Sequence, residues 1–372
     1  MKVPQFMPFV GQEEYEAIKQ CFDTNWITEG PLAKEFNKKL CEKIGVKYGV
    51  YAPNGTMALI LGLKALGVGP GDEVIVPDIT FFASATSVEF LGATPVFVDV
   101  GKDLQIDIAD CDRVLTNKTK AIMPVHLFGF AANMDKVMMF ANKHNLLVVE
   151  DAAQALGIKW NGKGCGSYGD VGCFSFFADK TLTTAEGGFV TTNSEEVYEN
   201  LLFLRNQGRR SSGTFVHPQI GYNFRMTDIQ CAIGLAQLKK FDTLVERKGH
   251  IHKKYTELLS DCGGVRVYQP PKEVDPFVPF RVIIETVWSR SEVLMKHIRK
   301  NEIEPRMFFY PLHKQPAFQK WQSNTRYADK NFAVANKLYD HGVCLPSFVA
   351  ITDQQIEYVC EVIKEFYAGG RA

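Results

Sequence analysis

The stretch Phe174-Ser-Phe-Phe-Ala-Asp-Lys-Thr-Leu-Thr-Thr-Ala-Glu-Gly-Gly188 decides the fold and contains the most informative residue of the chain, Lys180. An aromatic, strand-like run precedes this lysine, and a Glu-Gly-Gly turn leads into another strand. We therefore expect the lysine at a cleft rather than on a solvated face. Upstream, Val148-Val-Glu-Asp-Ala-Ala-Gln-Ala-Leu-Gly157 indicates a buried strand that ends in an acid, and a glutamine follows three residues after Asp151.

A lysine and an acid in these places suggest the cofactor pyridoxal 5'-phosphate (PLP). Its aldehyde needs a lysine amine for a Schiff base, and its ring nitrogen needs a carboxylate to stay protonated and draw electrons from the substrate. Lys180 fits the first need and Asp151 the second. Glu150 is the competing acid, because only one of two adjacent carboxylates is expected to point at the ring. The alternative to a cofactor contact, for either acid, is a structural ion pair.

Seven residues together resemble the motif of a known family. The motif residues are Asp151, Gln154, Ser175, Lys180 and Glu186-Gly187-Gly188. Further matching segments are Pro53-Asn-Gly-Thr56, Gly69-Pro-Gly-Asp-Glu-Val-Ile-Val-Pro77, Gly221-Tyr-Asn-Phe-Arg-Met-Thr-Asp-Ile229 and Phe308-Phe-Tyr-Pro-Leu-His-Lys-Gln-Pro316. The chain resembles the nucleotide-sugar aminotransferases, the DegT-type branch of fold type I PLP enzymes. The likeness runs nearly end to end.

The resemblance implies an α/β fold with a large PLP-binding domain, expected at residues 1–245, and a smaller C-terminal α/β domain, expected at 246–372. The large domain of this fold type holds a mostly parallel seven-stranded sheet between helices. The residue pattern agrees, because helical spacings alternate with short runs that are apolar on both faces. One long helix is expected from Thr227 to about Leu259, where the chain leaves the large domain.

Composition narrows the class of protein. Lys and Arg number 42, as do Asp and Glu, so no net charge favours binding to nucleic acid or an anionic membrane. The N-terminus lacks a secretory leader pattern and no apolar run is long enough to span a bilayer, so we expect a cytoplasmic protein. The nine cysteines form no Cys-x-x-Cys pair, which favours reduced thiols and predicts no metal site.

Further cofactor contacts are expected around the lysine. Gly55 and Thr56 open a helix whose free amides suit a phosphate, although a structural cap would use the same residues. The resemblance makes Ser175 a second phosphate ligand. Gln154 is expected to donate its amide to the phenolic oxygen of PLP. Phe81 is expected to stack on the pyridine ring, whereas its neighbour Phe82 suits the core.

The remaining site residues depend on the resemblance. It implies a homodimer in which Asn223 reaches the partner's phosphate site, on the same loop as Arg225. The His313 loop matches a family segment near the sugar or diphosphate. Arg306 and Lys314 are candidates for the diphosphate charge, although solvated surface positions would explain them equally well. Glu186 is also expected to bind substrate.

The expected reaction is transamination of a nucleotide-linked 4-keto-6-deoxy sugar with L-glutamate as amino donor. The sequence is most similar to enzymes that aminate C4 of a GDP-linked sugar. It differs from the residues common in those enzymes at Gln154, Ala178-Asp179 and Ala185. Amination at C3, or of a UDP- or dTDP-linked sugar, therefore stays open. A sugar dehydratase of this fold would carry histidine at position 180, and a silent regulatory scaffold would be expected to lose Lys180 or Asp151.

Overall fold

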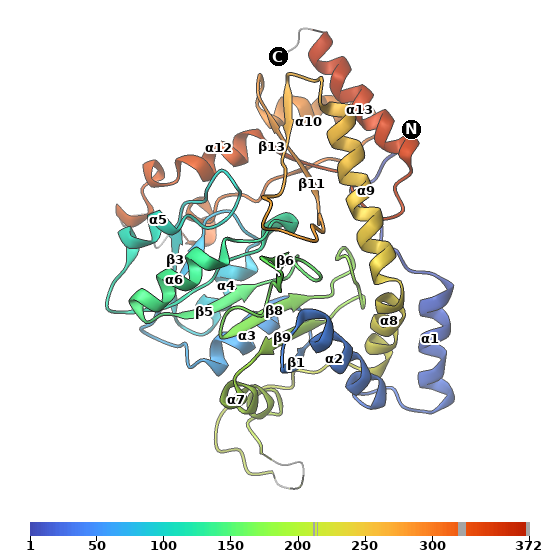
Figure 1. The fold of residues 1–372 in the computed structure, drawn as a ribbon. Coiled ribbons are helices and arrows are strands. Elements are labelled where there is room, and N and C mark those ends of the chain that lie inside the picture. Colours follow the sequence, from blue (N-terminus) through green and yellow to red (C-terminus); the bar gives the residue numbers. More distant parts are fainter. Residues whose placement is uncertain (211–212, 214, 319–324, 370–372) are drawn as a thin grey trace.

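The computed structural model describes residues 1–210, 213, 215–318 and 325–369, and its main body is a seven-stranded sheet (Figure 1). The sheet order is β1 (Tyr48–Ala52), β9 (Gly188–Thr192), β8 (Val171–Ser175), β5 (Leu147–Asp151), β4 (Thr119–Ile122), β2 (Glu73–Pro77) and β3 (Thr94–Val98). Strand β9 runs antiparallel to both neighbours, and the other pairs are parallel. The expected mostly parallel sheet is confirmed.

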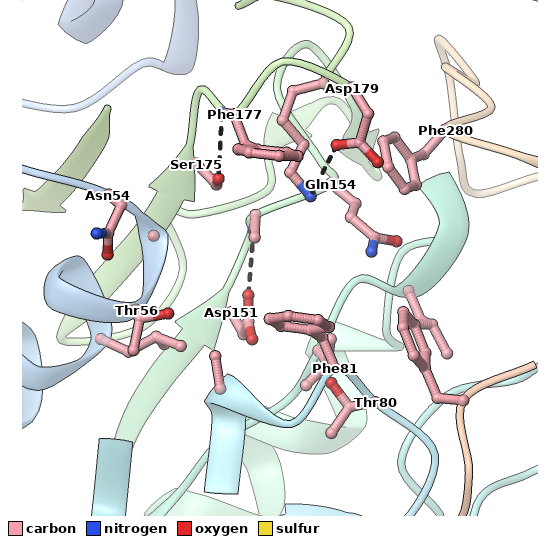
Figure 2. Close-up of a pocket in the computed structure, with 18 of the residues that line it drawn as sticks. Asn54, Thr56, Thr80, Phe81, Asp151, Gln154, Ser175, Phe177, Asp179 and Phe280 are labelled. Carbon is pink, nitrogen blue, oxygen red and sulfur yellow. Dashed lines mark hydrogen bonds and ion pairs between the residues drawn. The ribbon is translucent and has the colours of Figure 1, made fainter. Parts of the chain in front are cut away.

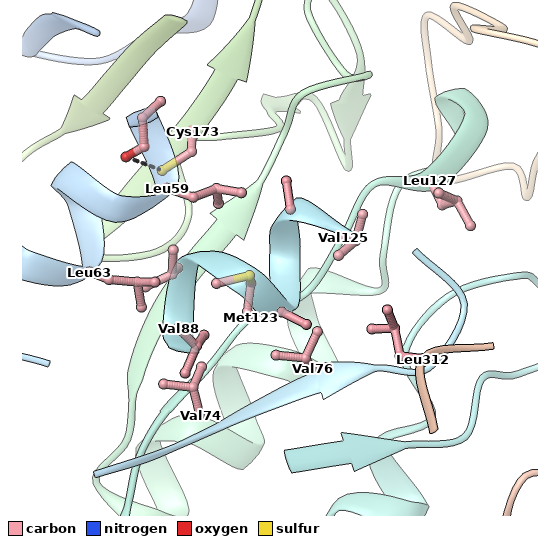
Figure 3. Close-up of a cluster of buried hydrophobic side chains, with 14 of the residues drawn as sticks. Leu59, Leu63, Val74, Val76, Val88, Met123, Val125, Leu127, Cys173 and Leu312 are labelled. Atoms are coloured by element: carbon pink, nitrogen blue, oxygen red, sulfur yellow. Dashed lines mark hydrogen bonds between the residues drawn. The ribbon is translucent and has the colours of Figure 1, made fainter. Parts of the chain in front are cut away.

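Side chains along each strand of this sheet alternate between two core clusters. In β2, Val74 and Val76 belong to one cluster, and Ile75 between them belongs to the other. Figure 3 shows the first cluster, where Leu59 of the helix α3 lies near Cys173 of the sheet. Because successive side chains of a strand point to opposite faces, helices cover both faces of the sheet.

The helices are assigned to these layers by their buried residues. The first cluster takes side chains from α3 (Gly55–Ala65), α4 (Ala83–Phe90) and α7 (Glu195–Arg205), and the second from α2 (Pro31–Ile44), α6 (Met134–His144) and α8 (Asp228–Lys239). Other elements are α1 (Gln12–Asp23), α5 (Ile108–Cys111), the two-stranded β6 (Lys159–Trp160) and β7 (Lys163–Gly164), and short 3-10 turns at Asp112–Val114, Leu127–Gly129, Leu312–Lys314, Pro316–Phe318, Thr325–Tyr327 and Asp329–Asn331.

A second, antiparallel sheet lies toward the C-terminus. Its order is β10 (Val265–Val267), β11 (Val282–Thr286), β13 (Gly342–Leu345) and β12 (Arg306–Met307). The helices of this part are α9 (Phe241–Leu259), α10 (Ser291–Lys300), α12 (Ala333–His341) and α13 (Asp353–Ala368). Residues of α9, α10 and α13 form a third core cluster with this sheet, and Val3 near the N-terminus joins it.

The connection between the two sheets differs from the single long helix expected from the sequence. Two helices, α8 and α9, meet at Lys240, whose φ of −106° and ψ of 10° interrupt the helical geometry. Figure 1 shows α9 extending from α8 toward α13. The expected domain boundary after residue 245 falls inside α9. Residues beyond this boundary, such as Phe308 and Leu338, pack in the first cluster with the main sheet, so the division into two domains stays a proposal.

Across the described residues, every helix is too short or too polar to serve as a membrane span.

Candidate active site

A cavity of about 370 Å³ lies where strands β5 and β8 end (Figure 2). Asp151 is the last residue of β5 and Ser175 the last of β8, so both reach the carboxyl edge of the sheet, where ligands of α/β folds gather. The predicted site residues that line it are Gly55, Thr56, Phe81, Asp151, Gln154, Ser175, Lys180, Glu186 and Arg306. Segments far apart in sequence therefore meet in one cavity.

The start of α3 forms one corner of the cavity. The side chain of Asn54 accepts a hydrogen bond from the amide of Met57 at 3.0 Å and caps the helix. The first amides of any helix lack partners within the helix, and they carry its positive dipole end. A Cβ on Gly55 would lie 2.8 Å from the Cβ of Ser175, so glycine lets the helix approach β8 closely. This corner suits a phosphate group.

Lys180 lines the cavity and lies between an aromatic ring and charged side chains. Its side chain is 15% exposed, and its Nζ lies 4.6 Å from the centre of the Phe280 ring and 3.9 Å from Oδ1 of Asp179. Burial lowers the pKa of the lysine, Arg281 lowers it further, and Asp179 opposes both. The neutral amine, which is the form that attacks an aldehyde or accepts a proton, is therefore more accessible here than for a lysine in water.

Asp151 is the buried acid of the cavity. Its Oδ2 accepts a hydrogen bond from the Ser84 hydroxyl at 2.7 Å, and Oδ1 accepts one from the Ala153 amide at 3.2 Å. Burial raises the pKa of this carboxyl, and Ser84, Ala153 and Lys180 offset part of that rise. A protonated ring nitrogen beside it would stabilise the carboxylate, so the donor set fits a pyridinium ring.

Glu150 has a different role from its neighbour. Its two oxygens accept hydrogen bonds from the amides of Gly166, Tyr168 and Gly169, each at 2.7 Å, and Nε2 of His126 lies 3.0 Å from Oε2. Nδ1 of the same ring accepts from the Ala132 amide at 3.1 Å, so Nε2 is the donor toward the glutamate. The carboxylate is thus fully used in holding a turn.

We expect Glu150→Gln to destabilise the fold. An amide has one accepting oxygen, so buried donors would lose a partner at a cost of about 1–3 kcal/mol in the free energy of unfolding. Chemical denaturation followed by circular dichroism measures this change. The exposed Glu357→Gln is the matched control, because its oxygen contacts only Lys254 on the surface. Equal unfolding midpoints for wild type and Glu150→Gln would contradict the structural role.

Gln154 and Phe81 both face the cavity. Oε1 of Gln154 accepts a hydrogen bond from the amide of Phe128 at 2.6 Å, which leaves the amide nitrogen available to a ligand. Phe128 has a φ of 57°, an uncommon value for a residue other than glycine, and this contact helps to hold it. Phe81 is 57% exposed and meets Phe309 edge to face, whereas Phe82 packs against the buried Phe318.

A hydroxyl pair behind Asp151 was missed by the sequence analysis. The hydroxyls of Thr80 and Ser84 lie 2.9 Å apart, and Ser84 donates to the carboxylate. Their spacing of four residues between the end of β2 and the first turn of α4 is a signal that could have pointed to them. Asp179 with Arg281 was also missed, because the two residues are 102 positions apart.

His313 and Lys314 lie outside the cavity of their own chain, so their expected place beside the sugar or diphosphate stays a prediction. His313 is buried, with Nδ1 2.7 Å from Asp78 and Nε2 3.1 Å from Asp329, and its ring stacks on Phe332. Burial opposes its charged form, but the two carboxylates raise the pKa of this histidine above its usual range. Lys314 lies 2.9 Å from Asp329. Neither residue lines the cavity, because the carboxylates hold both elsewhere.

Asn223 lies outside the cavity of its own chain. It lines a separate open depression with Gln207, His217 and Gly221, in the segment between α7 and α8. Arg225 in the same segment donates to Oδ1 of Asn206 at 3.3 Å. The role of Asn223 in a partner's site therefore stays a prediction.

The comparisons with known proteins agree on the class of enzyme. A model of the DegT/DnrJ/EryC1/StrS aminotransferase family matches residues 8–364. GDP-perosamine synthase of Escherichia coli O157:H7 is 39% identical over 370 residues, covering 98% of this chain and 99% of the relative. UDP-N-acetyl-3-dehydro-alpha-D-glucosamine 3-aminotransferase of Acidithiobacillus ferrooxidans is 37% identical over 329 residues, covering 87% and 86%.

Among solved structures, Spr1654 from Streptococcus pneumoniae in its PLP form matches with a TM-score of 0.93 at 27% identity, covering 99% of both chains. The family model and the full-length relatives agree with a cavity that combines a buried lysine, a buried acid and a helix N-terminus. The chain therefore belongs to the DegT/DnrJ/EryC1/StrS aminotransferase family and is a PLP-dependent sugar aminotransferase.

Proposed function

We propose that the protein aminates C4 of a GDP-linked 4-keto-6-deoxy sugar with L-glutamate as the amino donor, and that the product serves a surface polysaccharide or glycoconjugate. The observation that carries the transamination is the cavity in which Lys180, Asp151 and the start of α3 converge. The choice of sugar is supported by the near full-length similarity to GDP-perosamine synthase.

Each cavity residue has a part in this chemistry. Bound PLP supplies an aldehyde for imine exchange and a ring that withdraws electrons from the reacting carbon. Lys180 holds the cofactor and, as a neutral amine, takes the α-proton of the amino donor at Nζ. Asp151 keeps the ring nitrogen protonated, and Ser84 holds this carboxylate in position. The first turn of α3 and the hydroxyl of Ser175 receive the phosphate.

The open end of the cavity would receive the sugar nucleotide. Arg306 lines the cavity, and a guanidinium is suited to the oxygens of a diphosphate. Glu186 also lines it, as an acceptor for sugar hydroxyls. Polar side chains that meet the hydroxyls or the diphosphate of a substrate discriminate between sugar nucleotides, so Arg306 and Glu186 are the first candidates for specificity.

Amination at C3 of a UDP-linked sugar is the second candidate, because the 3-aminotransferase relative is 37% identical to this chain. A panel of GDP-, UDP- and dTDP-linked keto sugars, each with the keto group at C3 or C4, tests both. The enzyme is incubated with each sugar and L-glutamate, and 2-oxoglutarate and the amino sugar are measured. We expect the highest kcat/KM for the GDP-linked 4-keto sugar. A higher value for a UDP-linked 3-keto sugar would overturn this choice.

We also propose a homodimer with composite sites, in which Asn223 completes the phosphate site of the partner. The proposal is supported by the position of Asn223, which lies away from its own cavity in an open depression. Mixing inactive Lys180→Ala with inactive Asn223→Trp would then create dimers with one doubly altered site and one intact site. We expect recovery of up to about half the activity per heterodimer, as two-fold symmetry requires.

Activity assays after subunit exchange, with the exchange verified by native mass spectrometry, measure this recovery. The control mixes Lys180→Ala with Asp151→Asn, two lesions that the structure places in the same cavity. That mixture should stay inactive apart from the residual activity of Asp151→Asn. A failure of the first mixture to recover after full exchange would show that Asn223 serves the site of its own chain or only the fold.

A further inference from the structure

One carboxylate and three cationic side chains surround the ring of Phe280. Nζ of Lys180 lies 4.6 Å from the ring centre, Cζ of Arg281 4.3 Å and Nζ of Lys248 6.0 Å. The carboxylate is that of Asp179, which lies close to both Lys180 and Arg281. Such a group of charges is costly to bury unless its members are paired.

The two oxygens of Asp179 are used differently. Oδ2 accepts a hydrogen bond from Arg281 at 2.6 Å, and this guanidinium is only 2% exposed. Oδ1 is buried and has no hydrogen-bond partner in the part of the chain that the structure describes. The nearest cation on that side is Nζ of Lys180, at 3.9 Å. Figure 2 shows Asp179 beside the cavity with this contact marked.

The third cation is held away from this contact. Lys248 donates hydrogen bonds to the carbonyl oxygens of Phe280 at 3.1 Å and Ser347 at 2.8 Å. Burial lowers its pKa to about 7, and Arg281 contributes in the same direction. Lys248 is therefore a weak competitor for Asp179 near neutral pH, whereas Arg281 is a permanent one.

The charges that face Lys180 have opposite effects on it. Besides the dominant effect of burial, Asp179 and Asp151 favour the ammonium form, whereas Arg281 and Arg306 disfavour it. Asp179 is close enough to pair with an ammonium at Lys180, and the positive charge of Arg281 weakens that attraction. The unused Oδ1 has the donor it needs only if Nζ moves closer than in this structure.

We propose that Asp179 is a positioning residue that receives the Lys180 amine whenever that amine is not bonded to an aldehyde, with Arg281 holding the carboxylate for this contact. The inference deepens the proposed function and rests on the role given there to Lys180. Whenever the amine is free and protonated, it would rest as an ammonium against Oδ1 of Asp179. Its return to the cavity would then begin from a defined position.

The test measures the proton affinity of Lys180 in cofactor-free protein. Competitive acetylation with acetic anhydride at a series of pH values, followed by peptide mass spectrometry, reports the midpoint for Lys180 separately from Lys248. Asp179→Asn should lower the Lys180 midpoint by about one pH unit, because an opposite charge at this distance is lost. Arg281→Met should raise it by a similar amount, since Asp179 would then pair with the lysine alone.

The two variants should shift the Lys180 midpoint in opposite directions. A general disturbance of the fold would instead shift it in the same direction in both. Arg281→Lys, which keeps the charge, should restore a midpoint near that of wild type. The control is the surface pair Arg290 and Asp340, where Arg290→Met and Asp340→Asn should leave the midpoint unchanged. An unchanged or raised midpoint in Asp179→Asn would overturn the proposal, and so would a lowered midpoint in Arg281→Met.

The same variants are then loaded with PLP and assayed with glutamate across pH. The acid limb of the kcat profile should move with the Lys180 midpoint in both variants. Because acetylation needs neither cofactor nor substrate, its outcome is independent of the proposed reaction. If the Lys180 midpoint shifts as expected in both variants but the wild type does not transaminate, the proposed function alone is overturned. If the wild type transaminates but the midpoint does not shift, the role of Asp179 alone is overturned.

Discussion

Lys180→Ala is expected to yield a folded protein without measurable transamination and without the absorbance of PLP joined to a lysine, near ~410–430 nm. The substitution removes both the amine that holds the cofactor and the base that moves the α-proton, so the rate should fall at least about 10⁴-fold. Desolvation in the cavity lowers the pKa of this lysine, and Lys180 is the one lysine among the described residues that line the cavity. Absorbance spectra and a glutamate half-reaction measure the two effects.

Lys253→Ala is the matched control, because this lysine is 76% exposed and its contact is with Glu257 on the same helix. It should keep both the absorbance and the activity. Circular dichroism checks that Lys180→Ala is folded. Turnover at the wild-type rate in Lys180→Ala would reject Lys180 as the residue that holds the cofactor.

Asp151→Asn is expected to keep the cofactor bound but to lose most of the activity, by roughly 100-fold or more. A neutral amide cannot hold the ring nitrogen protonated, so the ring draws fewer electrons from the reacting carbon. The phosphate corner at Gly55 and Ser175 is untouched by this change, so binding should survive. Cofactor content by absorbance and steady-state rates with glutamate and the keto sugar separate the two properties.

The neighbouring acid provides the contrast. Glu150→Gln should lower stability through the lost amide contacts while its remaining folded fraction turns over normally. If Asp151→Asn works normally and Glu150→Gln loses the chemistry in a folded protein, the wrong acid has been assigned. The two variants thus distinguish a cofactor contact from a turn anchor.

Local patterns were sufficient for much of the main sheet. Most of the runs at β2, β3, β4, β5, β8 and β9 are apolar on both faces, and burial on both faces follows from covering a parallel sheet with helices. The same logic places residues at the carboxyl ends of parallel strands beside one another. The sequence could therefore predict that Asp151 and Ser175 share an edge. It did not locate β1, whose place at the edge depends on pairing with β9 across the chain.

By itself, the sequence determined the fold class, the family resemblance and most of the predicted residues that meet in the cavity, because these depend on periodicity and on short motifs. Tertiary structure showed what occupies the acid next to Asp151, since the amides of the 166–169 turn and the ring of His126 hold Glu150. Tertiary structure also holds His313 outside the cavity of its own chain, through a contact with Asp78, 235 positions away. Contacts over such separations depend on how the layers pack, and local spacing carries no record of them.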